Sequence, residues 1–127
     1  MAGVLGFLAV GLGAMGAHGL EAGWEAKHGL AEAAYRLDVW KTASHYHIVH
    51  VLVLLLLAYV FPSRAEGRWI FRSFVGGILL FSGSLYVLCL TGVKWLGAVT
   101  PAGGLLLLLG WLLLTLTARP GSGARSV

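Results

Sequence analysis

The chain has 127 residues, enough for one domain. Hydrophobic residues make up 58% of it and charged residues only 11%, whereas soluble domains carry about 25% charged residues. A water-soluble protein of this size cannot bury so much apolar surface, so we expect an all-α integral membrane protein with the lipid bilayer as its partner. The net charge of +4 comes with no basic face or nucleic-acid motif, so we expect no nucleic-acid partner.

The first apolar segment, residues 2–20, is predicted to be the first membrane span. Its glycines are interleaved with alanines, a composition that makes a poor helix in water but allows helices to pack closely in lipid. We therefore expect this helix at the centre of the bundle. A cleaved signal peptide is the weaker alternative, because no basic residue precedes the apolar run.

A charged stretch follows at residues 21–41 and separates the first two predicted spans. Within it, apolar residues recur every three to four positions, as at Leu30, Ala34 and Leu37. This spacing favours a short amphipathic helix that lies on the membrane surface with its apolar face down. A solvated connecting loop is the alternative.

The remaining apolar residues predict three more membrane spans, at residues 42–61, 69–91 and 98–118. The four spans would form a single four-helix domain over residues 1–118, followed by a flexible tail at residues 119–127. In the third span, Gly76 and Gly83 lie two helical turns apart, so we expect a close-packing seam along their face.

The distribution of Lys and Arg predicts how the protein crosses the membrane. The side that holds both termini and the loop between the second and third spans has five basic residues against four on the other side. These five are Arg64, Arg68, Arg72, Arg119 and Arg125. We therefore expect a multi-pass protein of the plasma (inner) membrane, with both termini in the cytoplasm.

Several short motifs follow one another along nearly the whole chain. They are GAMGAHGL at residues 13–20, WKTA at 40–43 followed by Tyr46 and His50, LFSGSLY at 80–86, TG at 91–92, LGAVTPAGG at 96–104 and GW at 110–111. Together they resemble the YgdD-like family of small four-helix membrane proteins, a domain-of-unknown-function family with eukaryotic relatives. The resemblance implies the four-helix fold and no particular activity, substrate or cofactor. His18 and His50 match the family pattern, whereas His45 and His47 depart from it.

Polar side chains gather toward the outer half of the predicted bundle. An ionisable group in a membrane interior needs a partner or a function, and His50 lies about 12–14 Å below Lys41 along its helix. Tyr46 shares the face of His50 at i, i+4, whereas His45 and His47 are expected at the interface and to be dispensable. The expected polar patch consists of His18, Tyr46, His50, Ser82, Ser84, Tyr86 and Thr100.

The favoured interpretation of this patch is structural, with hydrogen bonds from the histidines holding the helices in register. The protein would then be a structural, interaction or accessory membrane component, with association into a homo-oligomer or with another membrane protein. The alternative is a binding protein for a lipid, quinone or other small membrane ligand, in an outward cavity lined by His50, Tyr46 and Tyr86.

A metal or haem site is the third interpretation, with His18, His47 and His50 as weak candidate ligands. The spacing of these histidines is not specific, and no acid or thiolate is predicted in the same layer. The chain also carries no nucleophile elbow, P-loop or HExxH motif. We therefore expect no metal site or other cofactor, and a non-enzymatic role is favoured.

Overall fold

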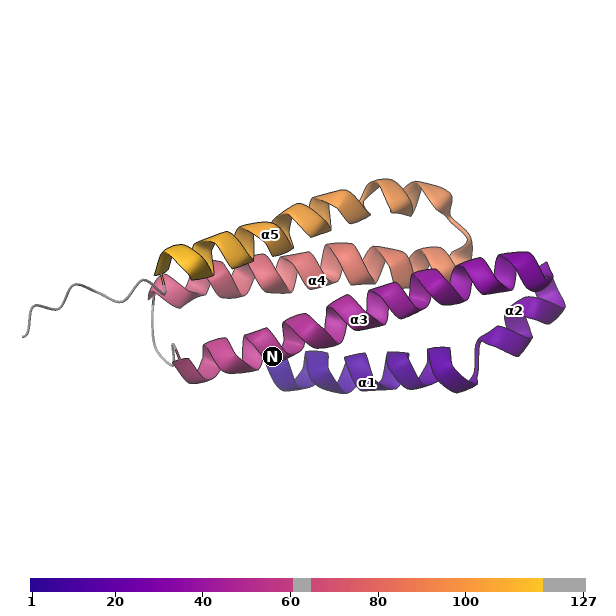
Figure 1. Ribbon diagram of the computed structural model, residues 1–127, viewed down its shortest axis with the longest axis horizontal. Coiled ribbons are helices and arrows are strands. Elements are labelled where there is room, and N and C mark those ends of the chain that lie inside the picture. The colour runs from indigo at the N-terminus through magenta and orange to yellow at the C-terminus, as the bar shows by residue number, and fades with distance from the viewer. Residues whose placement is uncertain (61–64, 118–127) are drawn as a thin grey trace, which may run out of the picture.

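The protein is built from α-helices joined by short connections (Figure 1). The computed structural model describes residues 1–60 and 65–117, and this part of the chain contains no β-strand. Its elements are α1 (Ala2–His18), α2 (Glu21–His28), α3 (Leu30–Val60), α4 (Ala65–Thr91), the 3-10 helix η1 (Lys94–Ala98) and α5 (Thr100–Thr117). Phe61, residue 118 and the predicted flexible tail at residues 119–127 lie outside the described residues.

The long helices fall on the four predicted spans, and the all-α fold is confirmed. Three stretches are long and apolar enough to cross a membrane, namely Leu30–Val60, Gly67–Thr91 and Lys94–Thr117. The fourth would be α1 taken together with α2, which meet at a bend of 54°. By itself α1 has 17 residues, about the minimum for a span.

The predicted surface helix over residues 21–41 is in fact divided between two elements. Its first part is α2, which ends at Gly29, where a φ of 84° favours a residue without Cβ. Its second part is the beginning of α3, which runs for 31 residues because neither glycine nor proline interrupts it. Leu37 and Trp40 there are buried among neighbouring helices, so the apolar pattern marks protein packing in this part of the stretch.

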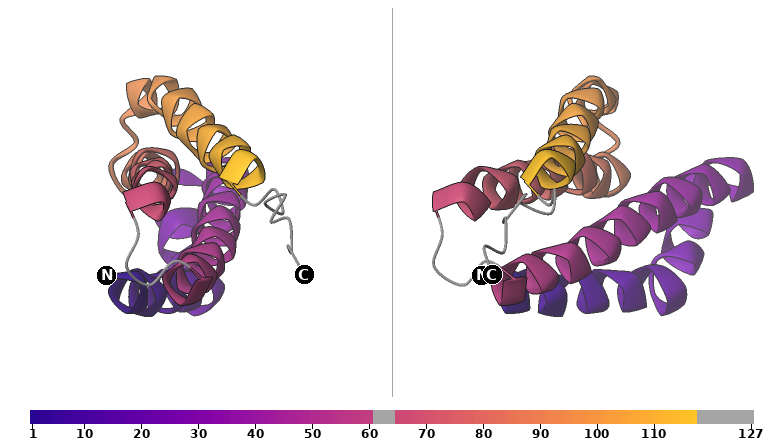
Figure 2. Two further views of the ribbon diagram at one scale, coloured as in Figure 1. Left: turned by 90° about the vertical axis from the view of Figure 1, so that its left-hand side faces the viewer. Right: turned by 60° about the vertical axis from the view of Figure 1, so that its left-hand side comes forward.

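The four long helices form an open series. In the described part of the chain α3 packs against α1 and α4, and α4 packs against α5, but the backbones of α1 and α5 do not approach each other. Figure 2 shows α1 and α5 on opposite sides, with α3 and α4 between them. Helix α1 therefore lies at an edge, and the prediction that it is central is wrong.

The glycines of α1 explain this error. A Cβ added at Gly3, Gly11 or Gly13 would meet nothing within 4 Å, so these residues face away from the rest of the described protein. Gly6 and Gly16 do face α3, since a Cβ at Gly6 would lie 3.4 Å from Val51 and one at Gly16 would overlap the indole of Trp40. Small residues permit a close approach, but they do not say on which face of the helix it takes place.

Two apolar clusters hold the series together. The first lies nearer the connection between α3 and α4 and consists of Ala2, Leu5, Val51, Leu54, Leu57, Ile70, Phe74, Ile78 and Leu107. The second lies at the end where α2 is found (Figure 1) and consists of Trp24, Ala33, Leu37, Trp40, Ala43, Tyr86, Leu88 and Cys89. Polar side chains of α3 and α4 lie along the helices between these two clusters.

The closest helix approach is between α4 and α5, and it depends on glycine. A Cβ at Gly103 would overlap the backbone nitrogen of Phe81, and one at Gly110 would lie 2.8 Å from the Phe74 ring. The seam predicted at Gly76 and Gly83 is only half correct. Gly76 does face Leu106 of α5, but a Cβ at Gly83 would meet nothing within 4 Å.

Replacing Gly103 by alanine should separate α4 from α5, whereas the same change at Gly104 should be tolerated. A Cβ at Gly104 lies 3.8 Å from the Phe81 ring, an ordinary contact, and both changes bring the same gain in helix propensity. We expect Gly103→Ala to lower the free energy of unfolding by about 1–3 kcal/mol. Denaturant unfolding in a mild detergent measures both variants, and equal stability would contradict this packing.

Candidate functional site

His50 on α3 is buried, and both nitrogens of its ring are hydrogen bonded. Nδ1 lies 2.7 Å from the carbonyl oxygen of Tyr46, and the Trp111 indole N–H donates to Nε2 at 3.2 Å. A carbonyl can only accept, so Nδ1 carries the proton and Nε2 has a free lone pair for the indole. One neutral tautomer of His50 therefore satisfies both partners.

Aromatic rings surround the imidazole of His50. The ring of Tyr46 is nearly parallel to it at a centroid distance of 6.0 Å, and the Phe74 ring lies 5.6 Å away. Trp111 completes the group and packs edge-on against Phe74 at 5.5 Å. Since the backbones of α3 and α5 do not touch, the Trp111 side chain is what reaches from α5 to the polar group on α3.

A second polar group lies between α3 and α4. The Tyr86 hydroxyl donates to Ser44 Oγ at 3.2 Å and lies 3.5 Å from Nδ1 of His47. Only 4% of His47 is exposed, so its ring is buried inside the helix series, and its expected depth near the membrane interface stays a prediction. It shares the buried face of α3 with Ala43 and Leu54, one or two turns away.

Two buried polar atoms have no hydrogen-bond partner within residues 1–60 and 65–117, Nε2 of His47 and Oγ of Ser82. The backbone of Leu5 on α1 lies beside the His47 ring without meeting the geometry of a hydrogen bond to Nε2. Both side chains lie in the interior of the helix series, at 4% and 1% exposure.

The hydroxyls of Ser84 and Thr100 form a third, smaller group. Ser84 Oγ donates to the Phe81 carbonyl at 3.0 Å and lies 3.0 Å from Thr100 Oγ1. Thr100 Oγ1 lies 3.3 Å from the Leu96 carbonyl oxygen as well, so its one hydroxyl hydrogen is shared between partners on η1 and α4 where α5 begins.

The predicted patch thus separates into distinct groups, and His18 belongs to none of them. His18 is exposed in the last turn of α1, while His47 and His50 are buried on α3. Within the described residues no three of the His, Cys, Asp and Glu side chains lie together as metal ligands would. The three weak metal candidates therefore do not converge.

Trp40 is an important residue that the sequence analysis singled out only as part of the WKTA motif. Its side chain is 1% exposed, and its indole N–H donates to the Leu12 carbonyl of α1 at 2.8 Å. Gly16, one turn further along α1, leaves the space that the indole fills. Both residues belong to the motifs quoted above, and that was the available signal.

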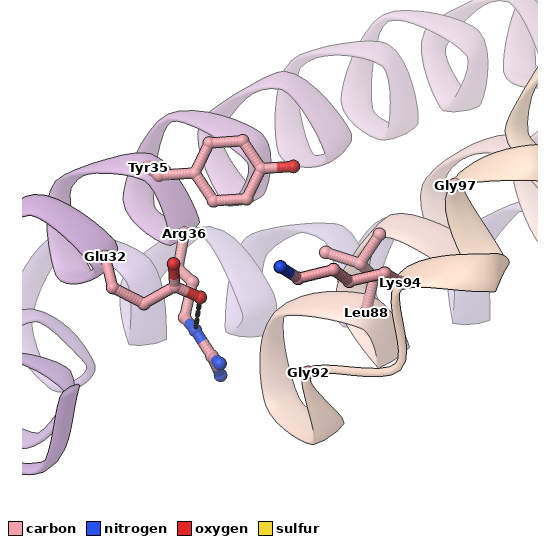
Figure 3. A pocket seen from close by; sticks show the side chains of 7 residues that line it. All are labelled: Glu32, Tyr35, Arg36, Leu88, Gly92, Lys94 and Gly97. Carbon is pink, nitrogen blue, oxygen red and sulfur yellow. Dashed lines mark hydrogen bonds and ion pairs between the residues drawn. The ribbon is translucent and has the colours of Figure 1, made fainter.

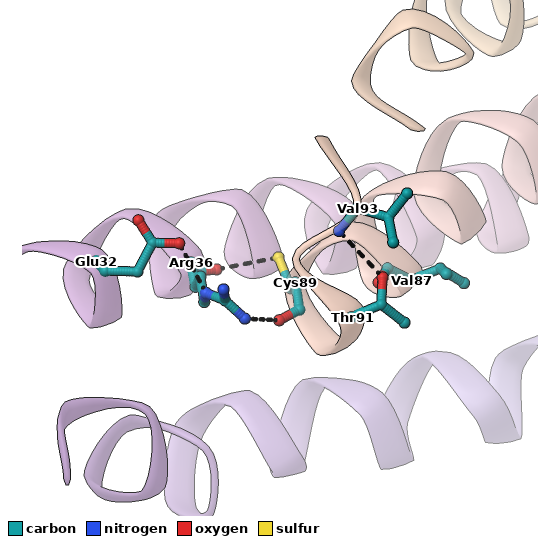
Figure 4. Close-up of polar contacts among 6 residues, drawn as sticks. All are labelled: Glu32, Arg36, Val87, Cys89, Thr91 and Val93. Carbon is teal, nitrogen blue, oxygen red and sulfur yellow. Dashed lines mark hydrogen bonds and ion pairs between the residues drawn. The ribbon is translucent and has the colours of Figure 1, made fainter. Parts of the chain in front are cut away.

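Arg36 was also missed, and it links the beginning of α3 to the end of α4 (Figure 4). Its guanidinium donates from Nε to Glu32 at 2.9 Å and from Nη1 to the Cys89 carbonyl at 2.7 Å. The Cys89 thiol in turn donates to the Arg36 carbonyl at 3.3 Å. The i, i+4 spacing of Glu32 and Arg36 was readable from the sequence, but the contact across 53 residues was not.

Comparison with known proteins identifies relatives over most of the chain. The family profile described as "Protein of unknown function (DUF423)" matches residues 12–104. UPF0382 membrane protein SSP2132 of Staphylococcus saprophyticus is 41% identical over 110 residues, which are 86% of this chain and 85% of the relative. UPF0382 membrane protein YwdK of Bacillus subtilis is 39% identical over 117 residues, covering 87% of this chain and 86% of the relative.

A yeast protein is among the relatives as well. UPF0382 membrane protein C1782.12c of Schizosaccharomyces pombe is 36% identical over 116 residues, covering 87% of this chain and 92% of the relative. The family resemblance inferred from the motifs is therefore confirmed, eukaryotic relatives included, and so is the membrane class of the fold. No solved structure matches the chain.

The hydrogen bond between Trp111 and His50 should be measurable as a coupling energy. We expect His50→Ala and Trp111→Phe each to lower the free energy of unfolding, and the double variant to lose less than the sum, by about 0.6–2 kcal/mol. Unfolding of the four proteins in detergent gives this coupling. Trp95→Phe, a change at a 67% exposed indole, is the matched control, and coupling of His50 to Trp95 of the same size would contradict a direct bond.

Proposed function

The chain belongs to the DUF423 family of membrane proteins, and from this premise we propose that it is a structural or accessory component of the membrane. The observation that carries the proposal is the complete use of the His50 ring inside the protein. Both of its nitrogens have protein partners, so neither is free to receive a ligand. The conspicuous histidine of the sequence thus serves to bring helices together.

Interhelical polar contacts of the same kind support this role. Trp40 ties α3 to α1, Tyr86 ties α4 to α3, and Thr100 lies against Ser84 where α5 begins. Such contacts contribute about 0.6–2 kcal/mol each in a membrane. Because lipid offers no competing hydrogen bonds, their main effect is on the register in which helices meet.

The alternative is a site for a quinone, a lipid or another small ligand between His50, Tyr46 and Tyr86. His50 and Tyr86 belong to separate hydrogen-bonded groups, and Tyr86 is bonded to Ser44. No observation favours this alternative over the structural role.

We further propose that the protein associates through its edge helix α1, with a second copy of the chain or with another membrane protein. Gly3, Gly11 and Gly13 lie on faces of α1 that meet no neighbour in the described part of the chain. Phe7, one turn from Gly3 and one turn from Gly11, is 79% exposed. Small residues flanked by large apolar ones suit close contact with a further helix.

The proposed location is the plasma (inner) membrane, with both termini in the cytoplasm. Arg68 and Arg72 lie in the first turns of α4, at the end of the helix series where the amino terminus is also found (Figure 1). The Arg72 guanidinium lies over the Trp69 ring at 5.2 Å, a pairing suited to the membrane interface. Arg64, Arg119 and Arg125 lie outside the described residues.

The structural role predicts that His50→Ala lowers the unfolding temperature without removing a bound molecule. An unpaired Trp111 indole should cost about 1–3 kcal/mol, whereas His18→Ala changes an exposed side chain and is the matched control. Native mass spectrometry in mild detergent should find the same bound lipids in all three proteins. A non-lipid molecule that binds the wild type and is lost from His50→Ala would overturn the proposal.

The same mass spectra give the number of chains in each particle. A monomer at every detergent concentration would overturn self-association.

The orientation predicts which end of the molecule an impermeant maleimide can reach in intact cells. A cysteine at Ala22 on α2 should be labelled from outside, whereas one at Arg68 on α4 should be labelled only after lysis. Both positions are exposed, and the unmodified chain, whose Cys89 is fully buried, gives the background. The reverse labelling pattern would show that the termini lie outside the cell.

A further inference from the structure

A small pocket opens at the end of the molecule where α3 begins, α4 ends and η1 connects α4 to α5 (Figure 3). It has a volume of about 150 Å³. Its lining consists of Glu32, Tyr35, Arg36, Leu88, Gly92, Lys94 and Gly97. None of these side chains takes part in the groups around His50 and Tyr86, so the pocket is a separate feature.

Arg36 gives the pocket a fixed positive charge. Glu32 accepts a hydrogen bond from its Nε and the Cys89 carbonyl accepts one from its Nη1, and these two bonds orient the guanidinium. Only 7% of the residue is exposed. Its Nη2 donates to no group in the described part of the chain, which leaves that edge of the guanidinium for a ligand. The fork of donors on arginine suits the oxygens of a phosphate or carboxylate.

Gly92 keeps this edge of the guanidinium accessible. Its φ is 74°, a conformation that favours glycine, and a Cβ there would lie 3.1 Å from Nη2 of Arg36. Gly97 also lines the pocket, and a Cβ there would lie 3.6 Å from the Leu88 side chain. The connection between α4 and α5 is therefore shaped around the open side of Arg36.

Lys94 supplies a second cation. Figure 3 shows its ammonium group directed over the pocket, toward the side where Tyr35 and Arg36 lie. The lining thus contains two cations and one carboxylate, and Glu32 already accepts the Nε–H of Arg36. The pocket has a surplus of one positive charge, and the Tyr35 hydroxyl adds a neutral donor.

The position of the pocket corresponds to the level of lipid head groups. Tyr35 is 55% exposed and Trp95 on η1 is 67% exposed, and such aromatic residues are enriched at the membrane–water boundary. Leu88 forms an apolar wall that could accompany the first carbons of a lipid. A bilayer holds phosphate at high local concentration at this depth.

From these observations we propose that the pocket binds a phosphate group between Arg36 and Lys94. The group comes from an anionic lipid head group or from a free phosphate, since the same donors serve both. Arg36 is the rigid donor of the site, and Lys94 is the mobile donor that closes over the anion. This site involves none of the His50 contacts, so the phosphate proposal and the proposed structural role can be tested independently.

The test measures binding to the full chain, purified in a neutral detergent, by native mass spectrometry. The probes are dioleoyl-phosphatidylglycerol and dioleoylglycerol, which share acyl chains and differ in the phosphate-bearing head group. Inorganic phosphate is tested separately by its effect on the unfolding temperature, at constant ionic strength. The variants are Lys94→Gln and Lys94→Arg, with Lys27→Gln as the matched control, because Lys27 is an exposed cation at the same end outside the lining.

The site predicts tighter binding of the phospholipid than of dioleoylglycerol, or stabilisation by inorganic phosphate. Either should weaken by about tenfold in Lys94→Gln and be retained in Lys94→Arg and Lys27→Gln. Preference for the lipid identifies a head-group site, and an effect of inorganic phosphate alone identifies a soluble ligand. The proposal is overturned if neither probe shows a phosphate-dependent effect, or if Lys94→Gln and Lys27→Gln behave alike.

Discussion

A polar group inside a bilayer has no water to bond with, and this constraint explains the arrangement of the helices in the membrane. His50 meets it by donating from Nδ1 within its own helix and accepting at Nε2 from the Trp111 indole. The indole crosses a gap that the backbones of α3 and α5 do not close. Aromatic rings then fill the space that water would otherwise occupy around the imidazole. The polar contact fixes the rotation of α5, and the glycines of α5 set how closely it can approach α4.

Sequence reasoning predicted the features that depend on long apolar runs. The all-α class and the approximate spans follow from runs of aliphatic residues, which leave little choice in a membrane protein. Which helices pack against each other could not be predicted in the same way. Glycines in α1 permit close contact but do not identify the partner helix, and most of them face away from the rest of the described protein. The boundary between α2 and α3 was missed because a single glycine with positive φ at position 29 decides it.

The candidate site was harder to predict than the fold. His50 stood out because an ionisable residue in an apolar run demands a partner, but the partner, Trp111, lies 61 residues away and looks like any lipid-facing tryptophan. The burial of His47 was not predicted, because it depends on which faces of α3 the neighbouring helices cover. The pocket at Arg36 depends on a turn at Gly92 that leads from the end of α4 into η1, beside the beginning of α3. Contacts between residues so far apart in the sequence are set by the packing of the helices and cannot be read from local patterns.

The open series of helices also bears on how the protein is assembled. Each long helix packs against the long helix that precedes or follows it in the chain, and adjoining ones run in opposite directions (Figure 1). A new span therefore finds its partner already made and close by, with a short loop to close. Helix α3 can pack against α1, α4 against α3 and α5 against α4, in the order of synthesis. The topology thus allows the chain to be inserted and packed one hairpin at a time, without waiting for its last helix.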